Sequence, residues 1–442
     1  MNQLLLRYVE SLPFFDMHSH VAGFDLGTPT DDREGLTLPK LLVNDYLAYL
    51  SGSCVDQAVA PQKNADGQGE DVEKSFRSIL PLLERCRGLT TYAALREGIR
   101  RLHPFVGKDI TLKNWRQINR RIGSVYRRYG HRAWQREVMK RAGVVRQVQI
   151  VHFPYVVDHW GSLPPAERQA QQQVLMPSLV LDGLLFTGFV ANNASRERSM
   201  ELVHLRPRGH AEHLEFCGRV LDRFLKEGGK SVKLLAAYLR PLRFEEVADP
   251  EAERLYEKGP DKLQPQELRR LQDNLLWRLL EMAVARKLPL IVHTGYSIPL
   301  EWGDPELLLN LFGSRRLSGL KVALAHSGWP NEAAAMIMAR TYRGAYIDLC
   351  WTPLLSEELG RRVLSEAIDT VPMNKILIGT DCGTVEMFMG TAVLIRRVLA
   401  EVLGDKVRRG QFPVETAKTV ARAILWENPC EFHGMDPALP GR

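Results

Sequence analysis

Cysteine is scarce and scattered in this sequence. The 442 residues include six cysteines, and no two of them have the C-x-x-C spacing of a redox or zinc-ribbon motif. This pattern argues against a disulfide framework and against a cysteine-based zinc site. We therefore expect reduced thiols and a cytoplasmic location.

Long apolar runs are missing as well. No segment approaches the ~20 consecutive apolar residues that a membrane helix requires. The opening stretch "MNQLLLRYVESLP" has three consecutive leucines but soon reaches Arg7 and Glu10, which argues against a secretory signal. Hydrophobic residues still make up 45% of the chain and charged residues 25%, which is typical of a globular protein with a large core.

Eight strand-like segments recur along the chain, most of them followed by a helical pattern. Several are runs of Val, Ile and Leu without polar alternation, as expected for parallel strands that are covered on both faces. This alternation predicts an α/β fold, a distorted (β/α)8 TIM barrel. The strand segments are 13–20, 144–152, 178–188, 231–238, 288–295, 321–328, 345–351 and 375–383, and helical patterns occupy 271–287, 331–342, 356–368 and 391–404.

A large helical insertion is expected after the first strand. A minimal barrel needs ~250 residues, so we interpret 1–442 as one barrel domain with extra segments, of which 25–142 is the largest. Within it, apolar residues spaced by three and four predict one amphipathic helix. These residues are Trp115, Ile118, Ile122, Val125 and Tyr129.

A net positive charge is concentrated in the later part of the insertion and the few residues after it. Residues 96–146 hold 15 Lys/Arg against 3 Asp/Glu, or +12, whereas the whole chain is +7. A solvated helical face explains most of these residues. Alternatively, Arg116, Arg120 and Arg121 stand over the pocket and attract an anionic substrate, which predicts that kcat/KM falls with added salt. A nucleic-acid surface is disfavoured because no recognisable nucleic-acid motif accompanies the charge.

Four histidines and one aspartate fall at the expected ends of strands. His18 and His20 end the first strand, and side chains at i and i+2 point to the same side of a strand. Taken alone, this pair could be two metal ligands or two surface histidines. His293, His326 and Asp381 end the fifth, sixth and eighth strands, at the face where TIM-barrel active sites lie. Their joint placement favours a metal site.

This arrangement resembles the signature of the amidohydrolase superfamily. The segments "SVKLLAAYLR", "AHSGWP" and "DCGTVEMFMG" are most similar to the branch called amidohydrolase 2, and the tail "ARAILWENPCEFHG" resembles the closing helix of the superfamily. The long insertion is similar to that of uronate isomerases. The branch also includes the amidohydrolase-like domain attached to some glutamine-synthetase-like proteins.

The resemblance implies one divalent metal ion, Zn²⁺ by preference, with Mn²⁺ or Fe²⁺ as alternatives. Its ligands would be His18, His20, His293 and Asp381. His326 would be a further ligand or, as we prefer, a hydrogen-bond partner of the metal's water. The pKa of such a water falls to ~7, and Asp381 would take its proton and later protonate the leaving group.

Lys233 departs from the pattern of binuclear members, which carry a carboxylated lysine at the end of strand four. Here Lys233 lies near the start of that segment, so we expect one metal rather than two and a role for Lys233 in binding substrate or supporting the ligands. Five further substrate-binding candidates lie at strand ends or, for Glu386, in the loop after Asp381, and three of them have a structural alternative. They are His152 (or a loop histidine), Tyr238, Arg240 (a carboxylate clamp), Trp351 (or core packing) and Glu386 (or a helix cap).

The sequence thus predicts a metal-dependent amidohydrolase that cleaves a C–N (amide) or ester bond in a small, anionic, carboxylate-bearing substrate. Non-hydrolytic alternatives are an aromatic-acid decarboxylase and a uronate isomerase. A different class is a non-catalytic metal-binding or RNA-binding barrel. Members of the superfamily are commonly oligomers, so a homo-oligomer is one expectation, whereas a membrane partner is not expected.

Overall fold

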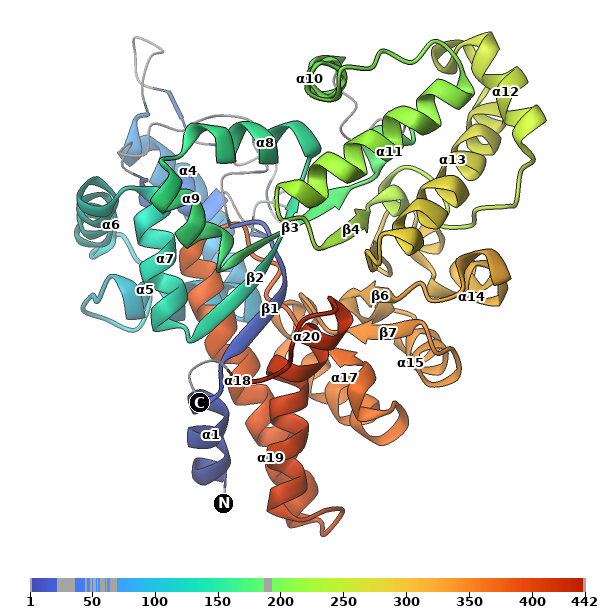
Figure 1. Cartoon of the computed structure of the whole chain (residues 1–442). Coiled ribbons are helices and arrows are strands. Elements are labelled where there is room, and N and C mark those ends of the chain that lie inside the picture. The colour runs from blue at the N-terminus through green and yellow to red at the C-terminus, as the bar shows by residue number, and fades with distance from the viewer. Residues whose placement is uncertain are drawn as a thin grey trace. The chain divides into compact units, whose positions relative to one another are not determined.

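Eight parallel strands form a nearly closed barrel in the computed structural model of this chain (Figure 1). The model describes residues 2–21, 36–43, 46–47, 50, 53, 55, 60, 62–63, 70–186 and 193–439. The strands follow the chain order from first to last, which confirms the predicted fold class. They are β1 (Phe14–Ser19), β2 (Val144–Val151), β3 (Leu175–Val180), β4 (Ser231–Leu234), β5 (Leu290–His293), β6 (Val322–Ala325), β7 (Ala345–Asp348) and β8 (Ile376–Leu377).

The strands are short and almost entirely buried, and from β2 to β8 each pairs in parallel with the next. Their Val, Ile and Leu side chains are covered on both faces, as the unbroken apolar runs predicted. The predicted extent of the third strand, 178–188, is wrong. Strand β3 ends at Val180, and the chain then turns through a 3-10 segment, Asp182–Leu184, in which the buried Asp182 carboxylate accepts a hydrogen bond from the main-chain N–H of Leu235.

Helices fill most of the remaining described chain. Before β2 lie α1 (Asn2–Ser11), α2 (Leu38–Val43), α4 (Val72–Cys86), α5 (Thr90–Leu102), α6 (Trp115–Tyr129) and α7 (His131–Arg141). Between β2 and β5 lie α8 (Phe153–Ser162), α9 (Pro165–Gln172), α10 (Asn193–Val203), α11 (His210–Lys226), α12 (Asp249–Lys258) and α13 (Pro265–Ala285). The rest are α14 (Leu309–Gly313), α15 (Glu332–Thr341), α16 (Thr352–Leu355), α17 (Glu357–Thr370), α18 (Val385–Arg408), α19 (Val414–Arg422) and α20 (Asn428–Phe432).

The chain divides into two compact units. The first unit comprises Met1–Val145, Trp351–Leu364 and Gly379–Ala421. The second comprises Arg146–Cys350, Ser365–Ile378 and Arg422–Arg442. Within the described residues, no helix is both long enough and apolar enough to cross a membrane.

In the first unit, α5 of the insertion lies against α18 with almost no space between the two backbones (Figure 1). A Cβ atom at Gly98 would lie 1.7 Å from the main-chain oxygen of Glu386, and one at Gly390 would lie 1.8 Å from that of Ala94. Only glycine fits at either position. The insertion is therefore fixed to the helix that begins just after Asp381.

The amphipathic helix predicted in the insertion is α6, and its buried face differs slightly from the predicted stripe. Trp115, Ile118 and Ile122 are buried as expected. The last buried side chain is Tyr126, whereas Tyr129 is 37% exposed. A helix repeats every 3.6 residues, so a stripe extended by steps of three and four drifts off the buried face by the fourth turn.

Candidate functional site

Strand β1 and the segment after β8 hold one cluster of the predicted ligands, within the first unit. All six residues of β1 are buried. The main-chain N–H of Asp381 donates to the carbonyl of His18 at 2.7 Å, and the N–H of His20 donates to the carbonyl of Cys382 at 2.9 Å. These two hydrogen bonds place the His18, His20 and Asp381 side chains at the same end of the strand.

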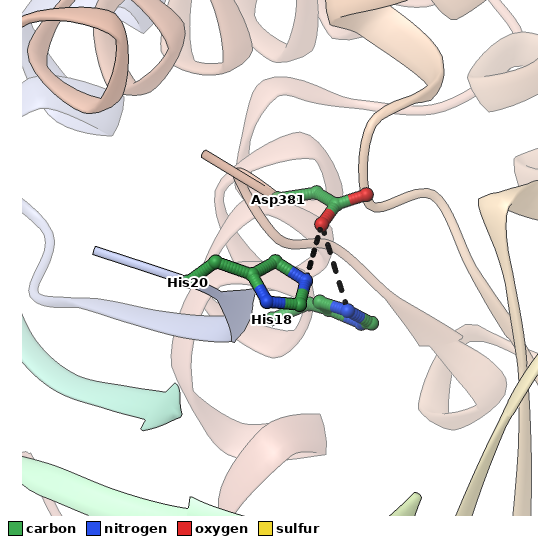
Figure 2. Close-up of side chains that lie close together, drawn as sticks. All are labelled: His18, His20 and Asp381. Atoms are coloured by element: carbon green, nitrogen blue, oxygen red, sulfur yellow. Dashed lines mark ion pairs between the residues drawn. The ribbon is translucent and has the colours of Figure 1, made fainter. Parts of the chain in front are cut away.

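The three side chains converge (Figure 2). The Nε2 atom of His20 lies 3.2 Å from Oδ1 of Asp381, and the Nε2 atom of His18 lies 3.5 Å from the same oxygen. His18 and Asp381 are only 1% and 4% exposed, whereas His20 is half-buried. Each residue offers one ligand atom, and the three atoms all lie within 4.8 Å of one another. The structure thus brings three of the predicted ligands together, and their role in holding a metal stays a prediction.

The donor set of this trio fits a divalent metal ion. Two imidazole nitrogens and one carboxylate oxygen are ligands that zinc accepts, and manganese or iron accept them too. Both imidazoles direct Nε2 at the same carboxylate oxygen, so their donor atoms are oriented before any ion binds. A chain with no use for a cation would gain little from burying this set.

Asp16 supports the trio through the neighbouring Thr380, and the sequence analysis did not single it out. Its Oδ1 accepts a hydrogen bond from the main-chain N–H of Thr380, and its Oδ2 accepts one from the Thr380 hydroxyl, each at 2.7 Å. Asp16 is fully buried. The pattern D-x-H-x-H was the available signal, because Asp16 shares the strand face of His18 and His20.

The backbone around Asp381 is tightly constrained. Asp381 has φ +53°, in the left-handed region that few non-glycine residues adopt. A Cβ atom at Gly379 would lie 2.7 Å from the main-chain nitrogen of His18. A close strand contact and a strained residue together fix the direction of the Asp381 carboxylate.

The second unit carries the other predicted metal-site histidines, His293 at the end of β5 and His326 directly after β6. Their rings face one another, with Nε2 of His326 2.8 Å from Nδ1 of His293. The Nε2 atom of His293 lies 3.0 Å from the carbonyl oxygen of Tyr296. Because His326 (φ +62°) and Ser327 (φ +55°) both adopt left-handed backbone, the turn after β6 directs the His326 ring toward His293.

Tyr238 and Cys350 complete this second cluster. The Tyr238 hydroxyl lies 3.3 Å from Nδ1 of His293, and the two rings are 4.3 Å apart. The Nδ1 atom of His326 lies 3.4 Å from both the carbonyl oxygen and the sulfur of Cys350. Tyr238, a predicted substrate ligand, is therefore in contact with a predicted metal ligand. Cys350 was not singled out by the sequence analysis.

Three more of the predicted substrate ligands lie on β4, directly before α8 and shortly after β7. Lys233 is fully buried on β4, beside Val180 and Ile291 in the register of the sheet. His152 directly precedes α8 and lines a pocket described below. Trp351 is 8% exposed and stacks on Tyr46 at 4.9 Å in the first unit. Their roles in binding substrate stay predictions.

Arg240 is fully engaged within the second unit. Its guanidinium donates to Asp273 at 2.6 Å, to Gln272, and to the main-chain carbonyls of Pro241, Arg243 and Arg269. The side chain is only 4% exposed, and burial lowers its pKa from the usual arginine value. A guanidinium has five N–H groups, and these partners use them within the protein. We infer a structural role for Arg240, and its predicted role as a carboxylate clamp is not part of the proposed function.

Glu386 is equally engaged, within the first unit. It is fully buried in the first turn of α18, where its carboxylate contacts Nε2 of His103 at 2.9 Å and accepts from the Tyr126 hydroxyl at 3.1 Å. Burial and this carboxylate raise the pKa of Tyr126 well above its ordinary value. Glu386 thus ties α18 to the insertion, and its predicted contact with substrate stays untested.

The basic residues of α6 are exposed. Arg116 forms an ion pair with Glu73 at 2.6 Å, and Arg120 and Arg121 lie on the solvent side of the helix. The predicted capture of anionic substrates by this helix stays a prediction.

The eight strands form a parallel barrel in which histidines lie at or directly after the ends of β1, β5 and β6, and Asp381 follows β8. Residues 219–434 match the family model described as Amidohydrolase, a span that includes His293, His326 and Asp381. The predicted resemblance to the amidohydrolase superfamily, an enzyme superfamily that acts on small molecules, is thereby confirmed.

Solved structures agree with this fold. A uronate isomerase from Thermotoga maritima superposes with a TM-score of 0.76 over 98% of this chain and 97% of its own, at 16% identity. A protein from Lactobacillus casei, proposed to be a metal-dependent hydrolase, superposes with a TM-score of 0.65 over 97% of both chains, at 17% identity. At such low identities these similarities establish the fold alone.

One curated relative is a fungal protein. Protein fluG of Emericella nidulans is 28% identical over 180 residues, which cover 38% of this chain. The matched part spans only 21% of that longer protein. The rest of the fungal protein lies outside the matched part.

Proposed function

We propose that this chain is a metal-dependent hydrolase that cleaves a C–N or ester bond in a small, carboxylate-bearing molecule. The observation that carries the proposal is the convergence of His18, His20 and Asp381, whose ligand atoms lie within 4.8 Å of one another. The match of residues 219–434 to the Amidohydrolase family model supports hydrolysis as the reaction.

One divalent ion, with zinc as the first choice, would be held by His18, His20 and Asp381. The superfamily resemblance adds His293 as a fourth ligand. When bound, such an ion acts as a Lewis acid and makes water a nucleophile at neutral pH. Asp16 and Thr380 keep the Asp381 carboxylate in place while the ion and substrate bind.

Proton transfer would fall to Asp381. Its carboxylate would take a proton from the water that attacks the substrate and would return that proton to the departing amine or alcohol. His326 holds the His293 ring through their 2.8 Å contact, and so orients a ligand as well as supplying a second proton carrier. Tyr238, which is 38% exposed and lies 3.3 Å from His293, would contact the substrate.

A second candidate is isomerisation of a uronate. The observation that favours it is the similarity in fold to a uronate isomerase over 98% of this chain. Isomerisation moves a proton between neighbouring carbons of the sugar acid and adds no water. The same histidines and aspartate could carry that proton, so the arrangement of the site does not separate the two reactions.

A substrate screen with a matched variant distinguishes these candidates. The full chain, supplied with Zn²⁺ or Mn²⁺, is assayed against N-acyl amino acids, lactones, aromatic acids and uronates, beside Asp381→Asn and the control His204→Asn. The exposed His204 has φ +52°, which Asn tolerates. We expect hydrolysis of an amide or ester that falls at least ~100-fold in Asp381→Asn and is unchanged in the control. Conversion of uronates alone would establish the isomerase instead, and metal-loaded protein without any turnover would overturn both.

A further inference from the structure

The second unit contains a pocket that none of the proposed metal ligands lines. It lies beyond the carboxyl ends of β2 and β3 and is closed by residues of α8, α10 and α11. One part of its wall is apolar, formed by Leu179, Leu184 and Phe216 among others. The other part is polar and includes His152 and Arg196.

Arg196 is the charged group of this pocket. It is half-buried in α10, and within the described part of the chain no carboxylate pairs with it. Two neighbouring arginines are different, because Arg198 is paired with Asp158 at 2.8 Å and Arg206 is paired with Glu197. A half-buried guanidinium without a counter-ion is costly, and an anion in the pocket would offset that cost.

The Arg196 guanidinium is held in place by neutral groups. Its Cζ lies 4.2 Å from the centroid of the Phe186 ring, and its charge acts on the nearby Tyr256, opposing the rise of the Tyr256 pKa that burial causes. The Phe186 ring stacks in turn on His213 at 4.9 Å, and His213 contacts the carbonyl oxygen of Leu184. Burial lowers the pKa of His213 to about 3, so this ring adds no second positive charge.

The lining also limits what kind of anion fits. None of the described residues that line the pocket carries a carboxylate, so the positive charge of Arg196 is unopposed. The hydroxyl proton of Ser199 is already donated to the carbonyl of Ser195 at 2.8 Å. A planar guanidinium matches the two oxygens of a carboxylate, whereas a phosphate needs more donors around it. The apolar wall favours a ligand with a hydrocarbon body.

We propose that this pocket binds a small organic carboxylate with an apolar body, its carboxylate on Arg196 and its hydrocarbon part against Leu179, Leu184 and Phe216. All of its lining residues lie in the second unit, and none of them is a proposed metal ligand. It assigns a ligand-binding role to Arg196 that the sequence analysis did not foresee.

Calorimetric titration of the full chain tests the proposal with benzoate, with neutral benzamide and with inorganic phosphate. The test variant is Arg196→Gln, and the matched control is Arg198→Gln on the same helix. We expect the wild type to bind benzoate saturably and to bind benzamide and phosphate at least ~10-fold more weakly. Benzoate affinity should also fall at least ~10-fold in Arg196→Gln and stay unchanged in Arg198→Gln. Arg196→Lys keeps the charge but not the planar pair of N–H donors, so it should bind benzoate more weakly than the wild type and more tightly than Arg196→Gln. Unchanged urea denaturation of both variants would show that the loss is not one of folding.

A second arm separates this pocket from the metal centre. Benzoate is titrated into the His18→Ala, His20→Ala double variant, which should bind it as the wild type does. Loss of binding in the double variant, or unchanged binding in Arg196→Gln, would overturn the proposal. So would equal affinity for benzamide or phosphate, because charge and apolar body together define the ligand class. None of these results bears on whether the chain is a hydrolase.

Discussion

At the scale of single residues, the site depends on groups that support the predicted ligands as much as on the ligands. Asp16 is not one of the proposed ligands, yet both of its carboxylate oxygens fix Thr380, the residue before Asp381. Outer groups of this kind orient ligands and tune their affinity for metal. Ligands can be inferred from residue type and position in a sequence, whereas a supporting carboxylate is recognised only by what it touches.

Replacing Asp16 tests this supporting role. In Asp16→Ala two donors of Thr380 lose their buried acceptor, which should lower the free energy of unfolding by about 1–3 kcal/mol. Metal affinity should fall by ~10–100-fold because Asp381 is no longer held. Chemical denaturation and competition with a chelator measure the two effects, and Asp261→Ala, at an exposed position, is the control. Wild-type metal affinity in Asp16→Ala would show that Asp381 needs no such support.

At the scale of elements, the insertion and the helix after Asp381 are packed as one body within the first unit. Glycines at the crossing of α5 and α18 bring the backbones together, and Glu386 contacts His103 and Tyr126 beside it. The sequence predicted the insertion helix and its buried face through Ile122, because apolar spacing reports local structure. It did not predict the crossing, because a glycine in a helix does not reveal which backbone lies against it.

Adding one methyl group at this crossing should be strongly unfavourable. In Gly98→Ala the new Cβ would lie 1.7 Å from the main-chain oxygen of Glu386, and main-chain atoms cannot move aside as a flexible side chain could. We expect a loss of at least about 1–3 kcal/mol in the free energy of unfolding.

Gly161→Ala in α8 is the matched control, since nothing lies within 4 Å of its new Cβ. It should be neutral or stabilising by up to about 1 kcal/mol. Equal effects of the two changes in urea denaturation would argue against the close crossing.

At the scale of the whole molecule, the alternation of apolar strands and helices was enough to predict the barrel. Strand ends were less well predicted: β3 ends at Val180 because the chain turns where Asp182 accepts a main-chain hydrogen bond. The residues His18, His20 and Asp381 were found because a parallel barrel brings strand ends to one face. The buried contacts of Arg240 with Asp273, and of Glu386 with His103 and Tyr126, could not be predicted, because these partners lie on other elements.

Two buried histidines make the stability of the molecule depend on pH. Burial lowers the pKa of His213 to about 3 and that of His433 to about 4, from an ordinary value of 6.5. Between pH 6.5 and about 4 the unfolded chain therefore binds more protons than the folded chain, and the free energy of unfolding falls as the pH falls. The loss should be on the order of 1 kcal/mol per pH unit for each histidine.

The double variant His213→Gln, His433→Asn should flatten this dependence in urea denaturation between pH 7 and pH 4.5. The variant has no imidazoles at these two positions to protonate on unfolding. Variant His204→Asn, at an exposed position, should keep the wild-type slope. An unchanged slope in the double variant would mean that other groups cause the acid sensitivity.

The most direct test of the proposed metal centre is the metal content of the purified full chain, measured by inductively coupled plasma mass spectrometry. The wild type and His204→Asn should each retain about one equivalent of a divalent transition metal after dialysis. The His18→Ala, His20→Ala double variant should retain almost none, because two of the donors that converge with Asp381 are gone. Full metal occupancy in the double variant, or a wild type that binds no metal even when it is supplied, would contradict the account.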